Sequence, residues 1–249
     1  LVGSEMCIRD RCSGCNFRLA KKDLLVVFLL SLLRATTSFS LLIAYQNIAT
    51  GVASTIHFMY PLAVSLAMMF FFHEKKSLLV MLAVLMSLFG AALLSSGELE
   101  AKSGDTIVGL VAACISVFSY GGYIIGVRTT RAAQINSTVL TCYVMGMGAV
   151  FYLIGAMATS GLHLVTDGYI WLIILGLALP ATAISNITLV RAIKYAGPTL
   201  TSILGAMEPL TAVVIGVFVF KELFTLNSAI GILLILLAVG MVVFRKQKS

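Results

Sequence analysis

Two charged side chains, Arg34 and Glu208, lie near the middle of long apolar segments of this 249-residue chain. On insertion scales a charge at the centre of a bilayer costs about 2.5–3.5 kcal/mol, so such a residue usually faces a cavity or an oppositely charged partner. In the sharper hypothesis, Glu208 binds a proton or a cation and Arg34 anchors the anionic group of a bound molecule. In the simpler alternative, the two residues form a structural ion pair, or Arg34 extends toward the membrane interface.

Other candidate site residues surround a proline in the segment 52–72. His57 is either a packed neutral side chain or a proton relay. Tyr60 directly precedes Pro61, whose missing N–H loosens a helix and can expose carbonyl oxygens to a cavity. Pro209 directly follows Glu208 in the same way. Pro61 and Pro209 are therefore candidate helix breaks, with His57 and Tyr60 as candidate site residues.

Aromatic side chains offer one further feature of a binding site. Tyr120, Tyr123 and Tyr143 can supply an aromatic wall, although an isolated tyrosine in a helical bundle more often bonds a neighbour.

The sequence predicts no metal site and no cofactor. Cys12 and Cys15 form a lone CxxC without a second cysteine pair or a nearby histidine. No two of the three histidines, His57, His73 and His163, lie at i+3 or i+4 from each other, the spacing at which a helix presents a metal-binding histidine pair of an intramembrane enzyme. A Walker A motif is also missing, which argues against an ATP-driven pump. We therefore expect no enzyme, and an intramembrane enzyme is the least favoured alternative.

Composition places these residues in a membrane protein. Hydrophobic residues make up 60% of the chain, charged residues make up 11%, and the mean hydropathy is +1.06. A soluble chain of this length could not bury so much apolar surface, so the bilayer must be its solvent. The net charge of +7 does not indicate a nucleic-acid partner, because the basic residues lie in short loops.

Eight apolar segments are long enough to cross a bilayer, which requires about 17–25 residues per helix. They are 24–46, 52–72, 78–96, 106–127, 138–159, 169–190, 198–220 and 228–244. The predicted fold class is an all-α membrane protein, a bundle of about eight transmembrane helices.

Basic residues predict the orientation of these spans. Successive segments between the spans lie on alternate sides of the membrane, so the Lys and Arg residues of each side can be counted. One side holds eleven of them: Lys21, Lys22, Lys75, Lys76, Arg128, Arg131, Arg191, Lys194, Arg245, Lys246 and Lys248. The opposite side holds two, Lys102 and Lys221. The positive-inside rule then predicts a multi-pass protein of the cell membrane with a cytoplasmic C-terminus.

A repeat relates the two halves of the chain. Residues 41–74 align without a gap to residues 189–222 at a constant offset of 148, which matches Pro61 with Pro209. Five predicted crossings separate the copies, and an odd number reverses the direction, so the repeat is expected to be inverted. The offset also pairs Arg34 with Thr182 and Tyr60 with Glu208. Both charges therefore break the symmetry of the repeat. Thr182, the residue that pairs with Arg34, is also a candidate site residue.

The repeat predicts how the chain is organised. The first eleven residues, LVGSEMCIRDR, resemble translated sequencing-adapter sequence, so we expect residues 1–20 to be non-native or disordered. Residues 21–100 are expected to hold the last three helices of an incomplete first repeat. Residues 101–249 are expected to hold a complete second repeat of five helices. The bundle would then be the remnant of a ten-helix, 5+5 inverted-repeat protein.

The stretches ATGVASTIHFMYPL and YAGPTLTSILGAMEPLTAVVIGVFVFKE carry a family resemblance. With the glycine-bearing helices that follow them, they resemble the drug/metabolite transporter superfamily, in its EamA-type branch. The resemblance implies an integral membrane secondary transporter that works by alternating access between inverted repeats. It implies a small metabolite as substrate and export of amino acids, their derivatives or drugs. A non-transporting scaffold or channel subunit is the main alternative.

The expected partners follow from that resemblance and from composition. They are a small-molecule substrate, the lipid bilayer and protons as a coupling ion, with a homodimer as one open arrangement and no nucleic acid.

Overall fold

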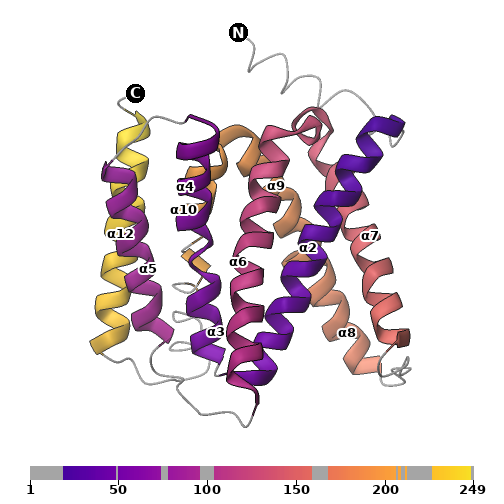
Figure 1. Ribbon diagram of the computed structural model, residues 1–249, viewed down its shortest axis with the longest axis horizontal. Helices are drawn as coiled ribbons and strands as arrows, with labels where there is room; N and C mark the ends of the chain where they lie inside the picture. The colour runs from indigo at the N-terminus through magenta and orange to yellow at the C-terminus, as the bar shows by residue number, and fades with distance from the viewer. Residues whose placement is uncertain are drawn as a thin grey trace. The chain divides into compact units, whose positions relative to one another are not determined.

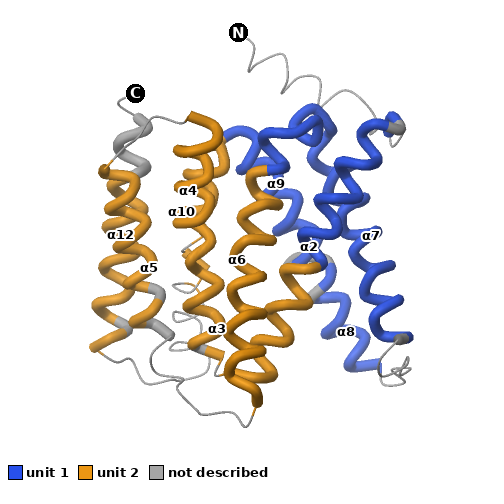
Figure 2. Tube along the Cα trace, viewed as in Figure 1, with its two compact units in different colours: residues 1–35, 126–195 blue, residues 36–125, 196–249 orange. Residues whose placement is uncertain are grey.

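The computed structural model of the protein describes residues 19–48, 50–73, 78–95, 104–158, 168–205, 207–208, 211 and 226–247. Within these ranges every regular element is a helix (Figure 1). The predicted all-α class of a helical membrane bundle is therefore confirmed. The chain divides into two compact units, residues 1–35 with 126–195 and residues 36–125 with 196–249 (Figure 2).

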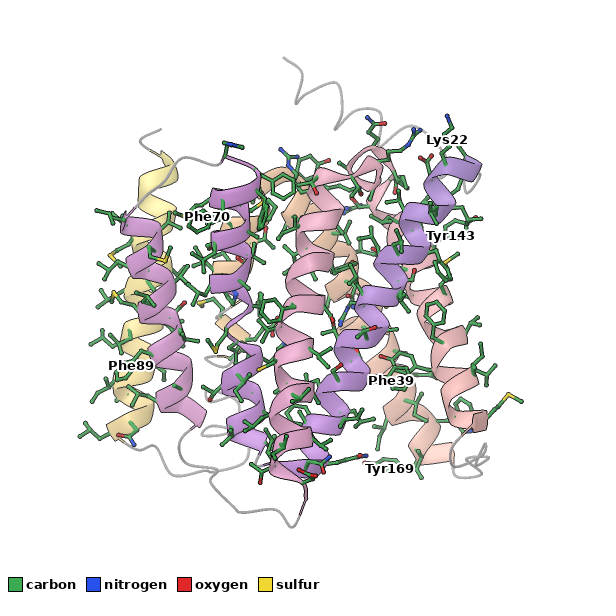
Figure 3. The ribbon with its side chains drawn as sticks, in the orientation of Figure 1. Lys22, Phe39, Phe70, Phe89, Tyr143 and Tyr169 are labelled. Atoms are coloured by element: carbon green, nitrogen blue, oxygen red, sulfur yellow. The ribbon has the colours of Figure 1, made fainter. Side chains whose placement is uncertain are left out.

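The helices have the length and the surface of membrane spans. Among the described residues, four are long and apolar enough to cross a bilayer: Lys22–Asn47, Val52–Phe71, Thr106–Thr129 and Ser137–Met157. Leu78–Gly90 and Ala229–Met241 are shorter apolar helices. Large apolar side chains lie on the outside, and Phe70, Phe89 and Tyr169 are 65%, 61% and 71% exposed (Figure 3). Such a surface suits lipid rather than water, and the chain is a multi-pass membrane protein.

The first unit contains the start of α2 (Lys21–Asn47), then η2 (Arg131–Gln134) and α7 (Ser137–Ala158). It continues through α8 (Gly168–Gly176), η3 (Leu177–Ile184) and α9 (Ser185–Ala196). These three are continuous, so the span predicted at 169–190 extends to Ala196. The element η3 is a π-helix that contains Pro180. Because proline cannot donate the usual helical hydrogen bond, the wider turns accommodate it without ending the helix.

Basic side chains tie the helix ends of this unit together. Arg131 Nε forms an ion pair with Asp23 Oδ1 at 2.8 Å, which joins η2 to the start of α2. Arg128 Nη1 donates to the carbonyl of Lys194 at 2.5 Å, and Lys194 Nζ donates to the carbonyl of Ile135. Arg128, Arg131 and Lys194 are among the basic residues that we assigned to one side of the membrane. Their bonds therefore also hold the helix ends of this unit together.

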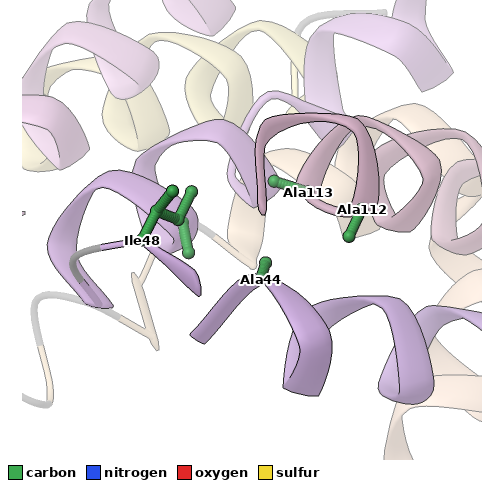
Figure 4. Close-up of a cluster of buried hydrophobic side chains, with 5 residues drawn as sticks. Ala44, Ile48, Ala112 and Ala113 are labelled. Carbon is green, nitrogen blue, oxygen red and sulfur yellow. The ribbon is translucent and has the colours of Figure 1, made fainter. Parts of the chain in front are cut away.

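The second unit contains α3 (Thr50–His57), α4 (Tyr60–Phe71), α5 (Leu78–Ser95), α6 (Thr106–Thr129), α10 (Pro198–Leu204) and α12 (Leu226–Gln247). Small side chains let the end of α2, α3 and α6 pack closely. Their buried cluster consists of Ala44, Ile48, Ala53, Ala112 and Ala113 (Figure 4). This cluster fixes the start of α3 against α6, and α3 leads directly into the candidate site.

Helices α5 and α12 lie side by side within the second unit (Figure 1). A Cβ atom on Gly90 would lie 2.8 Å from both the Gly231 carbonyl oxygen and Ile235 Cγ1. Ala83 and Ala238 share a second buried cluster. Position 90 meets position 231 while 83 and 238 lie together, so the two helices run antiparallel.

We expect Gly90→Ala to destabilise the protein by about 1–3 kcal/mol, because the new methyl group would press against backbone that cannot move aside cheaply. The free energy of unfolding in detergent, measured by thermal or denaturant unfolding, tests this. Gly146→Ala in α7 is the matched control, since no atom lies within 4 Å of its added Cβ. Both changes gain the same helix propensity, so equal effects on stability would contradict the close contact at Gly90.

Candidate functional site

The first candidate break interrupts the second predicted span. Helix α3 ends at His57 and α4 begins at Tyr60, with a turn between them. Pro61 has no N–H, so it cannot donate to the His57 carbonyl four residues earlier. The amide of Leu62 instead donates to the Met59 carbonyl at 3.0 Å. The backbone hydrogen bonds therefore restart at the turn, and Tyr60 is the first residue after it.

A second break occurs at the matching place in the other half of the chain. Helix α10 ends at Leu204, and the Glu208 amide donates to the Gly205 carbonyl at 3.0 Å, three residues back. Pro209, the candidate for this break, lies outside the described residues. The 148-residue offset that pairs the two copies also pairs Tyr60 with Glu208. Both residues thus stand directly beyond a helix interruption.

Tyr60 packs against the second break. A Cβ atom added to Gly205 would overlap the Tyr60 hydroxyl oxygen and lie 3.1 Å from Tyr60 Cζ. The Tyr60 side chain is 2% exposed, and Gly205, against which it packs, lies three residues before Glu208 in the chain. Glu208 itself is exposed. The structure therefore brings together two candidate residues that sequence reasoning paired only by their repeat register.

Aromatic rings extend this site onto α6. The Tyr60 and Tyr120 rings meet edge to face, with centroids 4.7 Å apart and planes at 80°. The His57 ring lies 5.6 Å from that of Tyr60 and 5.4 Å from that of Tyr120. Tyr123 stacks parallel to Tyr120 at 6.4 Å. Edge-to-face and offset ring pairs of this kind hold their members in fixed relative positions.

His57 also bonds a side chain that sequence reasoning did not single out. Its Nδ1 lies 2.9 Å from the Oγ atom of Ser116, and that hydroxyl donates to the Ala113 carbonyl at 2.6 Å. Ser116 is fully buried on α6. Ala53 of α3 and Ala113 of α6 share a buried cluster, and about one turn later in both helices His57 contacts Ser116. Helices α3 and α6 therefore run side by side in the same direction. A serine in an apolar helix carries no sequence signal for such a contact.

Arg34 and Thr182 belong to the first unit. Arg34 is partly buried on α2. Thr182 is exposed on η3, where its carbonyl accepts a hydrogen bond at 2.7 Å from Nδ2 of the buried Asn186. His57, Tyr60 and Glu208 belong to the second unit. The anion-binding role of Arg34 and its pairing with Glu208 both stay predictions.

The second unit therefore combines three kinds of polar group at the breaks: an accessible carboxylate, phenol hydroxyls and an imidazole. A carboxylate binds protons and cations, and aromatic faces attract cations as well. Within the described ranges, no three or more His, Cys, Asp or Glu side chains are grouped to hold a metal ion.

Comparisons with known proteins agree with this architecture. One solved structure, described as "Crystal structure of protein", aligns with a TM-score of 0.77 and 18% sequence identity, over 94% of this chain and 80% of the other. At that identity the likeness shows the fold alone. A search of curated proteins found no significant match. The sequence profile of the EamA-like transporter family matches residues 107–244, more than half of the 249 residues. The family carries small molecules across membranes and is not a family of enzymes. This chain belongs to the EamA-like transporter family.

Proposed function

We propose that this chain is a secondary transporter of the cell membrane, which moves a small metabolite by alternating access between two inverted repeats. The observation that carries the proposal is Glu208, an exposed carboxylate inside a segment of membrane-spanning length, beside the buried Tyr60 at the matching break. A carboxylate exposed to hydrocarbon is costly, whereas one that lines a water-filled cavity is not. The exposure of Glu208 therefore supports a role in which a substrate or a coupling ion reaches it.

Packing of α5 against α12 supports the inverted repeat. The offset of 148 pairs Ala83 with Gly231 and Gly90 with Ala238. Gly90 contacts Gly231, and Ala83 lies with Ala238 in one buried cluster. If each residue is replaced by its repeat equivalent, the first pair becomes the second pair. Such self-complementary packing is what a local two-fold axis produces. Transporters built from inverted repeats bind their substrates at broken helices between the repeats, near the middle of the bilayer.

The candidate residues divide the work of a proton-coupled carrier. Glu208 binds the proton or cation, and Arg34 binds the anionic group of the substrate. Residues 21–100 belong to the first repeat and residues 101–249 to the second, with the C-terminus in the cytoplasm. An amino acid or its derivative is the proposed substrate, because its carboxylate suits Arg34, and export is the proposed direction.

Purified protein in liposomes tests this function. We expect an imposed proton gradient to drive uptake or release of at least one labelled amino acid, amino-acid derivative or cationic drug. A pH-sensitive dye enclosed in the liposomes should report proton movement that depends on the same substrate. Substrate and proton fluxes equal to those of protein-free liposomes across these three classes would contradict transport and favour a scaffold.

A further inference from the structure

We propose that Ser116 is a positioning residue that holds neutral His57 in its Nδ1–H form, so that Nε2 is the atom that accepts a proton. The role of that proton in transport rests on the proposed function. The position of the proton on the ring does not, because it follows from hydrogen-bond geometry alone.

Counting protons at Ser116 sets the direction of each hydrogen bond. A serine hydroxyl has one proton to donate. Ser116 Oγ lies 2.6 Å from the Ala113 carbonyl oxygen, a distance at which two oxygens without a proton between them repel. The hydroxyl proton is therefore on that line. His57 Nδ1, 2.9 Å from the same Oγ, must then be the donor.

The other ring nitrogen is left to carry the chemistry. A neutral imidazole has one N–H, so fixing it at Nδ1 leaves the lone pair on Nε2. Among the described residues, Tyr60 from α4 and Tyr120 from α6 are titratable side chains whose rings lie beside that of His57, and Glu208 follows the break at the end of α10 against which Tyr60 packs. His57 is also the last residue of α3, where the helix dipole favours a positive charge.

The proton step is simple and balanced. Nε2 takes a proton from water and the ring becomes an imidazolium with charge +1, which loses the same proton to water when the site faces the other side. Nδ1 keeps its proton in both forms, so the bond to Ser116 is the same in both. Ser116 therefore keeps the ring in place while Nε2 gains and loses charge, beside the tyrosine faces that stabilise a cation.

Nitrogen-15 NMR of the full chain, labelled at histidine and held in lipid nanodiscs, tests the inference without any transport assay. His57→Gln identifies the His57 signals by their loss. In the neutral form we expect a protonated Nδ1 and an unprotonated Nε2, and on acidification the Nε2 signal should show the large shift of a nitrogen that gains a proton, while the Nδ1 signal changes much less. A neutral His57 with its proton on Nε2 would overturn the proposal.

Variants separate positioning from packing. Ser116→Ala should shift the neutral ring toward the Nε2–H form, which isolated histidine prefers, whereas Ser116→Thr should keep the original signals. Ser87→Ala is the matched control, because Ser87 is buried on α5 and donates to the Val84 carbonyl at 2.9 Å. An unchanged tautomer in Ser116→Ala, or an equal change in Ser87→Ala, would overturn the role of Ser116.

The pH dependence of transport is the second readout. If the chain transports, Ser116→Ala should change the pH profile of the rate, and Ser87→Ala should not. An unchanged profile in Ser116→Ala would overturn the use of Nε2 in coupling. If the chain shows no transport, the proposed function fails while the NMR result still decides where the proton lies.

Discussion

Replacing Glu208 with Gln is expected to remove proton-driven transport while the protein still inserts and folds. Glutamine has nearly the same size and accepts hydrogen bonds, but it cannot bind and release a proton. We expect gradient-driven flux in liposomes to fall by about tenfold or more, which corresponds to about 1.4 kcal/mol or more. Exchange of substrate across the membrane without a gradient should persist, because it needs binding but no net proton movement.

The matched control removes a carboxylate elsewhere. Asp105 lies just before α6, where its Oδ1 accepts from the amides of Ile107 at 2.9 Å and Val108 at 3.3 Å. Asparagine caps a helix about as well as aspartate, so Asp105→Asn changes the charge with little effect on folding. Its gradient-driven flux should stay near that of the unchanged protein. Gradient-driven flux at the normal rate in Glu208→Gln would rule out a coupling role for Glu208.

Much of the fold could be predicted because the membrane imposes simple rules. Apolar length predicts helices, and the described helices begin or end within a few residues of most predicted span ends. The prediction is least complete where a proline changes the helix locally. At Pro61 the span splits into α3 and α4, whereas at Pro180 it continues through the π-helical η3. Both outcomes relieve the same missing hydrogen bond, and packing around the helix decides between them.

The candidate site could be predicted only where composition makes a residue costly. A charge in an apolar segment is conspicuous, which is why Glu208 and Arg34 could be named from sequence. Ser116 is inconspicuous, because small hydroxyl side chains are common in membrane helices and the residue matters only through its contact with His57. Gly205 is equally ordinary until Tyr60 is seen to occupy the space of its missing side chain. Such contacts between distant segments depend on three-dimensional packing.

Gly205→Ala is expected to disrupt the site sterically. The added methyl group would overlap the Tyr60 hydroxyl, and Tyr60 is buried with little room to move. We expect a loss of about 1–3 kcal/mol in the free energy of unfolding, as for other overpacked interiors, together with loss of transport. Thermal unfolding in detergent and gradient-driven flux in liposomes measure the two effects.

Tyr60→Phe provides the compensating change, because it removes the overlapping oxygen and leaves Cζ at 3.1 Å from the new methyl group, a tight contact that a small shift relieves. The double variant should therefore be more stable than Gly205→Ala alone, with a coupling energy of about 0.5–3 kcal/mol in a double-mutant cycle. Additive losses would contradict the contact between the two breaks. The cycle also separates packing from chemistry at Tyr60. If the double variant regains stability but not transport, the Tyr60 hydroxyl itself is needed for transport. If it regains both, the role of Tyr60 is to pack against the second break, which positions Glu208.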